Sequence, residues 1–296
     1  MALFIEYKVD NKNMLDILKK TIWAWSENSP FTHGAAAAYY AVFSLPGLMI
    51  IIMYITTFFL DEEMVRSQIQ NVVGEFLGED VAATIQNIID KARIAGGGWS
   101  LIIGGLVLLF GASGLFNQLK HSFNEIWGVR AKPEKTILWT VINRGIAMGM
   151  AILIGVILLF SLYLSTALKL FSTWLAARIP ELEALQTLEN ALSFLVVSLL
   201  FTLMFKILPD IYIKIKYAFL GGVLCSLLFM LGEILFTMAL EYYSPQSVFG
   251  AAGSIVLLML WINCACMILQ LGAAFIKVLI LKYEKNVRTT RFVELI

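Results

Sequence analysis

The feature that most constrains this chain is a series of long apolar stretches that carry no Asp, Glu, Lys or Arg. Five stretches have no charged residue and a sixth is interrupted only by Glu233; they cover residues 34–60, 94–119, 145–168, 190–205, 242–276 and 217–240. A helix needs about 20 mostly apolar residues to cross a bilayer. Only 15% of the 296 residues are charged, whereas soluble domains are about 25% charged. The chain is therefore predicted to be an integral membrane protein.

We expect an all-α, polytopic fold with six transmembrane helices in a single membrane domain that covers residues 1–296. Pro209 is expected to end the fourth helix, because the residue before a proline is biased away from the helical conformation. The six spans are placed near residues 35–60, 99–119, 145–168, 188–208, 217–240 and 250–276.

The distribution of basic residues predicts the orientation of these spans. Lys and Arg are concentrated on the cytoplasmic side of membrane proteins. Seventeen of them lie in the N-terminal segment, the second and fourth loops and the C-terminal tail, and five lie on the opposite side. Both termini are therefore expected in the cytoplasm. The net charge of +1 provides no general attraction for nucleic acid, which is not an expected partner.

Three segments are expected outside the membrane. Residues 1–30 are predicted to form a cytoplasmic interfacial helix, residues 61–98 an external hairpin of two amphipathic helices, and residues 277–296 a cytoplasmic tail. The hairpin is interpreted either as a lid over an external opening or as a solvated helical hairpin.

The interfacial helix has an apolar face. Leu15, Leu18, Ile22 and Trp25 share this face, and most of the lysines lie elsewhere. Such a helix either lies on the inner leaflet, with its lysines near anionic head groups, or caps the helical bundle.

Several polar residues within or beside the spans are candidates for a pathway or polar cavity. Glu233 is the first of them, because an ionisable group inside a membrane usually faces a cavity or a partner. It is a candidate for proton coupling or cation contact, with snorkelling to the nearby interface as the alternative. The other candidates are Asn117, Gln118, Asn263, Gln270 and Arg144. The amides have an alternative role in hydrogen bonds between helices.

Proline and glycine residues predict local helix geometry. Pro46 lacks an N–H and is expected to kink or break the first span. Small residues allow helix backbones to approach closely. Two groups of glycines predict such contacts: Gly104, Gly105, Gly111 and Gly114 in the second span, and Gly145 and Gly149 in the third.

The chain has no recognisable catalytic constellation. It contains no P-loop, HExxH, GxSxG or Gly-rich dinucleotide turn. Cys225, Cys264 and Cys266 lack the spacing of metal ligands. His121 and Glu125 are four residues apart and are interpreted as a surface pair. We therefore expect no enzymatic activity, no catalytic residue, no cofactor and no metal.

Four motifs, in order along the chain, resemble the YihY/BrkB family of bacterial inner-membrane proteins, once labelled ribonuclease BN. The resemblance extends from about Pro30 to Lys277. The motifs are Ala35-Ala-Ala-Ala-Tyr39-Tyr40 with Phe43-Ser-Leu-Pro46; Gly111-Ala-Ser-Gly114 with Leu119, Asn124 and Ile126-Trp-Gly-Val129; Leu208-Pro209 with Gly221-Gly222; and Phe249-Gly-Ala-Ala-Gly-Ser254 with Leu260-Trp261 and Leu271-Gly-Ala273.

The resemblance implies a six-helix protein of the inner membrane with both ends inside. Proposed roles for the family include transport, envelope lipid handling and serum resistance. Family members often carry an acidic residue in the last helix where this chain has Ala274. A mechanism that requires a carboxylate there would depend on Glu233 in the neighbouring helix.

The resulting functional hypothesis is a transporter or an envelope lipid-handling protein. Its expected partners are membrane lipids and an amphiphilic or charged small substrate. One alternative is a membrane scaffold that binds envelope proteins. A membrane-bound ribonuclease is disfavoured, because metal-assisted cleavage needs several carboxylates and the second and fourth loops contain only Glu125, Glu134 and Asp210.

Overall fold

A computed structural model describes most of the chain. The described residues are 14–56, 98–132, 138–150, 152–154, 156–157, 183–243, 251–284, 289–290 and 293–295. The predicted external hairpin lies outside the described residues, except for its last position.

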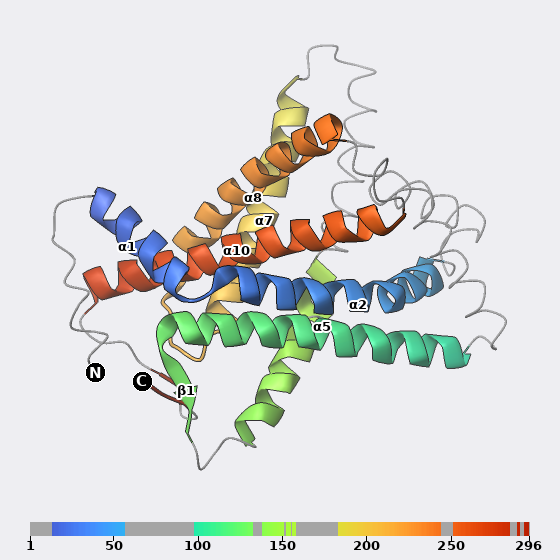
Figure 1. Cartoon of the computed structure of the whole chain (residues 1–296), viewed down its shortest axis with the longest axis horizontal. Coiled ribbons are helices and arrows are strands. Elements are labelled where there is room, and N and C mark those ends of the chain that lie inside the picture. Colours follow the sequence, from blue (N-terminus) through green and yellow to red (C-terminus); the bar gives the residue numbers. More distant parts are fainter. Residues whose placement is uncertain are drawn as a thin grey trace. The chain divides into compact units, whose positions relative to one another are not determined.

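The described structure is predominantly helical (Figure 1). A further helical segment covers residues 138–150. The named helices are α1 (Met14–Glu27), α2 (Pro30–Thr56), α5 (Gly98–Trp127), α7 (Glu183–Ile207), α8 (Ile215–Tyr243) and α10 (Ala251–Tyr283), and the strands are β1 (Val129–Ala131) and β2 (Val293–Leu295).

The helices coincide with predicted spans. α2, α5, α7, α8 and α10 overlap the first, second, fourth, fifth and sixth of them. α7 ends at Ile207, two residues before Pro209, as predicted. Two described stretches, Ile215–Met238 and Ile255–Tyr283, are long and apolar enough to cross a membrane. The count of six spans stays a prediction.

Pro46 does not break the first predicted span. α2 continues without interruption from Pro30 to Thr56, so the alternative of a broken helix is wrong. Prolines are tolerated within membrane helices because neighbouring groups and small local adjustments satisfy the backbone carbonyl that has lost its partner.

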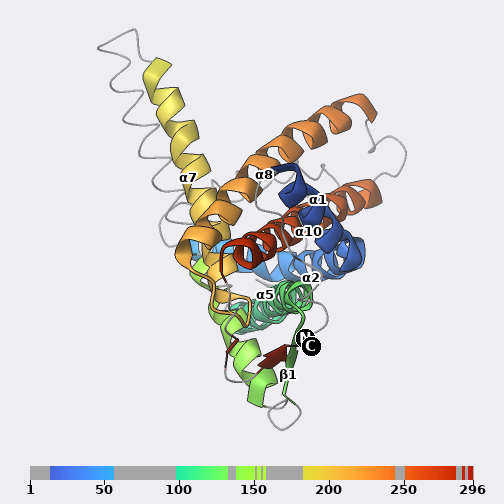
Figure 2. The ribbon, with the colours of Figure 1, turned by 90° about the vertical axis from the view of Figure 1, so that its left-hand side faces the viewer.

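Gly128 ends α5 and redirects the chain into β1. Its φ of 64° lies in the left-handed region, which glycine adopts without steric cost. Its N–H donates to the carbonyl oxygen of Glu125 at 2.9 Å. β1 then pairs antiparallel with β2, with Val129 opposite Leu295 (Figure 2). The sequence patterns did not predict this strand pair.

The chain divides into two compact units. Unit 1 contains Met1–Asn28, Lys120–Met230 and Ile268–Ile296, and unit 2 contains Ser29–Leu119 and Leu231–Met267.

The core of unit 1 is centred on Phe205 of α7, which is fully buried. Its ring centroid lies 5.5 Å from that of Phe123 on α5. Gly272 of α10 faces the same ring and Cys225 of α8, since a Cβ added at Gly272 would lie 2.2 Å from the Cys225 Sγ and 2.7 Å from the Phe205 Cζ. Unit 1 is therefore a close packing of helices that depends on a small residue in α10.

In unit 2, small residues of α5 pack against α2. A Cβ added at Gly111 would lie 2.6 Å from the Ser44 Cβ, and one added at Gly114 would lie 2.4 Å from the Tyr40 ring. The predicted close approach at these two glycines is confirmed. At Gly145 and Gly149, by contrast, no described atom lies within 4 Å of an added Cβ, and the predicted contact is not observed in the described part of the chain.

Candidate functional site

The link between α7 and α8 carries an acidic residue in an apolar setting. α7 ends before Pro209, and the next residue is Asp210. The neighbouring Leu208 and Ile211 are buried, at 0% and 3% exposed. Asp210 itself is only 7% exposed. A carboxylate buried to this extent requires hydrogen-bond partners and a compensating charge.

The Asp210 carboxylate accepts three hydrogen bonds from side chains. Lys120 Nζ donates to Oδ1 at 2.8 Å. Asn124 Nδ2 donates to Oδ2 at 2.8 Å, and Trp139 Nε1 donates to the same oxygen at 3.0 Å. We refer to Lys120, Asn124, Trp139 and Asp210 as the Asp210 cluster. It joins α5, the helical segment at 138–150 and the α7–α8 link within unit 1.

Asn124 holds Asp210 at two points. Besides donating to the carboxylate, its side-chain Oδ1 accepts the backbone N–H of Asp210 at 2.9 Å. Only one orientation of the amide satisfies both bonds, so the network itself determines how Asn124 is turned. The buried backbone of the link is thereby satisfied from α5.

The charge in the cluster is almost fully removed from solvent. The Lys120 side chain is 2% exposed and that of Asp210 is 9% exposed. Burying two charges costs several kcal/mol per ion, and their attraction offsets this cost only with good geometry and further hydrogen bonds. The Asp210 cluster provides both.

The C-terminal tail closes over the same link. The N–H of Thr290 donates to the Asp210 carbonyl oxygen at 3.0 Å, and Thr289 forms an isolated antiparallel bridge with Ile211.

Near the end of α10, Lys214 Nζ lies 2.8 Å from Glu284 Oε1. The hydrogen bond from Lys214 holds the pKa of the Glu284 carboxyl below its usual value, so this pair is charged at neutral pH.

Two further lysines donate to backbone carbonyls, one at the end of α5 and one in the α7–α8 link. Lys277 Nζ on α10 donates to the Ile126 carbonyl oxygen in the last turn of α5 at 2.7 Å. Lys206 in the last turn of α7 donates to the carbonyl oxygen of Ile213. Cations are favoured at helix C-termini because the terminal carbonyls have no partner within the helix and carry partial negative charge.

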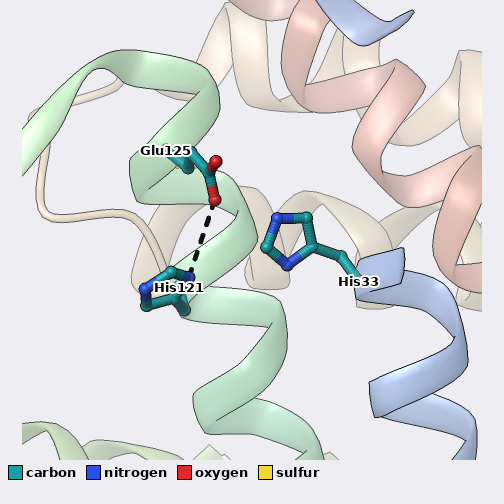
Figure 3. Close-up of side chains that lie close together, drawn as sticks. All are labelled: His33, His121 and Glu125. Atoms are coloured by element: carbon teal, nitrogen blue, oxygen red, sulfur yellow. Dashed lines mark ion pairs between the residues drawn. The ribbon is translucent and has the colours of Figure 1, made fainter. Parts of the chain in front are cut away.

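His121 and Glu125 form the surface pair that the sequence predicted. The His121 Nδ1 and Glu125 Oε2 atoms lie 3.8 Å apart on α5, and their side chains are 64% and 46% exposed (Figure 3). His33, the third residue labelled in Figure 3, belongs to α2 in unit 2. There its Nδ1 is hydrogen-bonded to Gln118 Nε2 at 2.9 Å.

The predicted pathway residues occupy different environments. Gln118 is half-buried and bonded to His33, as just described, whereas Asn117 is exposed. Asn263 lies where α10 approaches α2, since a Cβ added at Gly34 would fall 2.2 Å from its Oδ1. Gln270 is 1% exposed and lies inside unit 1. Arg144 is exposed.

Glu233 is exposed on α8. Met230 and Ile234, on either side of it in the chain, are exposed as well, at 43% and 53%. This position favours the alternative in which Glu233 snorkels to the membrane interface over the one in which it faces a cavity.

Sequence reasoning missed the Asp210 cluster as a site. In the sequence, Lys120 is one of seventeen basic residues that predict the orientation, Asp210 is a loop acid, and Trp139 belongs to none of the motifs. A signal existed, because Asp210 directly follows Pro209 between two apolar helices and Lys120 directly follows a charge-free stretch. The pairing itself joins residues 90 positions apart, and nothing in the local patterns relates them.

The Asp210 cluster is suited to holding segments together. Each carboxylate oxygen already accepts a hydrogen bond, and the adjacent ammonium balances the charge. The cluster therefore acts as a clasp between α5, the α7–α8 link and the tail.

Long apolar helices with a buried polar clasp define a helical membrane protein, and relatives support this class. The sequence matches the family described as Virulence factor BrkB over residues 22–291. The chain belongs to this family, which is the one its motifs predicted.

Similar proteins are named UPF0761 membrane protein. The one from Saccharophagus degradans is 28% identical over 258 residues, covering 83% of this chain and 55% of the relative. The one from Teredinibacter turnerae is 23% identical, covering 90% and 60%. The one from Psychromonas ingrahamii is 24% identical, and the match covers 90% of this chain and 90% of the relative. The chain thus spans little more than half the length of the first two relatives. No solved structure matches the chain.

Proposed function

We propose that the chain is a six-span protein of the bacterial cytoplasmic (inner) membrane, with both termini in the cytoplasm, that transports or handles an amphiphilic substrate such as an envelope lipid. The Asp210 cluster carries this proposal. By the charge count, it lies at the cytoplasmic end of the apolar helices. A set of hydrogen-bonded charges that links two helical segments, a loop and the tail can exchange partners as a unit, so it suits an element that opens and closes.

The energetics of the cluster support a role beyond stability. A buried ion pair is weak support for stability, because well-packed apolar residues of similar volume often stabilise equally well or better. A buried charge cluster is therefore better explained by a functional requirement than by stability alone. A cytoplasmic gate that must open repeatedly is such a function. The Asp210 cluster would hold this gate closed.

The exposed position of Glu233 favours a second candidate function. If the carboxylate lies at the interface and not in a cavity, the chain needs no pathway. It would then serve as a scaffold that binds envelope proteins. A ribonuclease role has less support, because the second and fourth loops contain only Glu125, Glu134 and Asp210 as acids.

The proposed orientation predicts a labelling pattern in intact cells. A cysteine replacing Lys132 should react only with reagents that reach the cytoplasm, whereas one replacing Asp80 should react with impermeant reagents from the periplasm. The reason is the concentration of basic residues on the side that carries Lys132. Unlabelled Cys225, Cys264 and Cys266 in the parent protein provide the background. Periplasmic labelling at position 132 would invert the proposed topology.

The proposed activity predicts lipid movement between leaflets. The purified protein, reconstituted in vesicles of phosphatidylethanolamine and phosphatidylglycerol, should expose inner-leaflet fluorescent phospholipid to an impermeant quencher faster than protein-free vesicles do. The paired substitution Lys120→Met with Asp210→Leu should change this rate, because it replaces the clasp with apolar contacts.

The matched control is the pair His121→Ala with Glu125→Ala, which removes an exposed ion pair from the same helix and should leave the rate unchanged. Equal rates with and without the wild-type protein would contradict lipid movement and favour the scaffold. A wild-type rate that the Lys120→Met/Asp210→Leu protein reproduces would separate the activity from the Asp210 cluster.

A further inference from the structure

Helix α1 has one side that is buried in the protein and another side on which apolar residues are exposed. Thr21 and Ala24 are buried, at 3% and 2% exposed. Leu15, Leu18 and Ile22 are exposed, at 69%, 48% and 56%. Their spacing of three and four residues aligns them along the helix. We call these three residues the α1 stripe. The stripe faces away from the protein, although its side chains are among the most apolar of the segment.

The inner side of α1 is held to unit 1. Thr21 and Ala24 on this side are buried within unit 1, to which α1 belongs. Because α1 is fixed on this side, the stripe cannot be hidden by a small rotation of the helix.

The chain itself limits how far α1 can lie from the membrane. Only Asn28 and Ser29 separate α1 from Pro30, where α2 begins. α2 then enters the charge-free stretch at residue 34. Exposed aromatic residues continue along α2, with Phe31, Tyr39 and Phe43 at 66%, 58% and 50% exposed. The apolar surface of α1 is therefore joined along the chain to that of a helix expected to face lipid.

We propose that α1 lies in the head-group region of the leaflet at which α2 enters the bilayer, with the α1 stripe against acyl chains. Under the proposed orientation this is the cytoplasmic leaflet. Lys19 is exposed beside the stripe, where its ammonium group can reach lipid phosphates while its methylenes follow the apolar residues. The partly exposed Asp16–Lys20 ion pair, 3.1 Å between Nζ and Oδ2, lies further around the helix.

A lipid surface fits this arrangement better than a protein partner does. A helix bound flat at the interface has apolar residues on one side, a flanking cation and a polar side. The α1 stripe, Lys19 and the Asp16–Lys20 pair supply these in order around the helix. Electrostatic attraction to anionic lipid then acts in the same direction as burial of the stripe.

Spin labels on the full-length protein test this proposal. In a background with Cys225, Cys264 and Cys266 replaced by alanine, Leu18→Cys, Ile22→Cys and Lys20→Cys are labelled separately with a nitroxide. The proteins are reconstituted in vesicles of phosphatidylethanolamine with phosphatidylglycerol. Collision rates are then measured with oxygen, which concentrates in the bilayer, and with a water-soluble nickel chelate.

The ratio of oxygen to nickel collisions should be several-fold higher at positions 18 and 22 than at position 20, which serves as the matched control on the same helix. Equal nickel accessibility at all three positions would place the stripe in water and overturn the proposal. Exclusion of both reagents at 18 and 22 would mean that protein covers the stripe and would overturn it too, and spin–spin broadening would identify that protein as a second copy. The result is separate from the labelling at position 132, which decides only which leaflet is meant.

Discussion

Replacing Asp210 with alanine should lower the free energy of unfolding by about 3–5 kcal/mol, because it leaves the Lys120 ammonium buried without a counter-charge. The effect should be this large because Lys120 is only 2% exposed and the same change removes the acceptor of Asn124 and Trp139. Chemical or thermal unfolding of the purified protein in one detergent, followed by circular dichroism, measures the difference.

Two comparisons make the result specific to the buried charge. The paired change Lys120→Met with Asp210→Leu should recover most of the loss, since apolar residues replace both charges. Removing the exposed His121–Glu125 pair from the same helix should cost about 1 kcal/mol or less. If Asp210→Ala unfolds no more easily than the His121→Ala/Glu125→Ala protein, the cluster is not the clasp that its geometry indicates.

Replacing Gly222 with leucine should destabilise the protein by about 1–3 kcal/mol through overpacking. A Cβ at this position would lie 2.4 Å from Thr202 Oγ1 and 2.6 Å from the Ser198 carbonyl oxygen. One of these atoms belongs to the backbone of α7, so the helices α7 and α8 must separate. The change is expected to reduce thermal stability even though leucine is a better helix former than glycine.

Gly105 offers a control for the same substitution. No described atom lies within 4 Å of a Cβ added there, so Gly105→Leu should be neutral or mildly stabilising by its higher helix propensity. Size-exclusion profiles after heating both variants in the same detergent give the comparison. Equal loss in the two proteins would show that glycine replacement is harmful for reasons other than the α7–α8 contact.

Local sequence patterns were sufficient to predict the positions of the helices and some of the close contacts between them. Charge-free stretches located α2, α5, α7, α8 and α10 because apolar composition is a property of neighbouring residues. Pro209 predicted the end of α7 because a proline restricts the backbone of the residue before it. The glycines at 111 and 114 were correctly expected at a close helix approach, whereas Gly145 and Gly149 have the same spacing and show no such contact in the described part. Spacing alone does not say whether another helix lies opposite.

The candidate site depends on contacts between residues far apart in the sequence, and no local pattern predicts such contacts. Gln118 and Asn117 are adjacent and equally polar, yet one bonds to His33 and the other is exposed, because successive helix residues point in directions about 100° apart. Glu233 is an isolated charge within a predicted span, but it lies on an exposed part of α8. Lys120 and Asp210 look like ordinary loop charges in the sequence, and only their pairing makes them distinctive.

The sequence by itself determined the membrane class, the family and the positions of the apolar helices, because each depends on composition or on motifs within a few residues. It also defined the stripe of α1 through its three- and four-residue spacing. Only the tertiary structure decided that Asp210 meets Lys120, Asn124 and Trp139, that the tail pairs with β1, and that the α1 stripe faces outward. These features depend on which distant segments approach one another, and that approach results from the packing of whole helices.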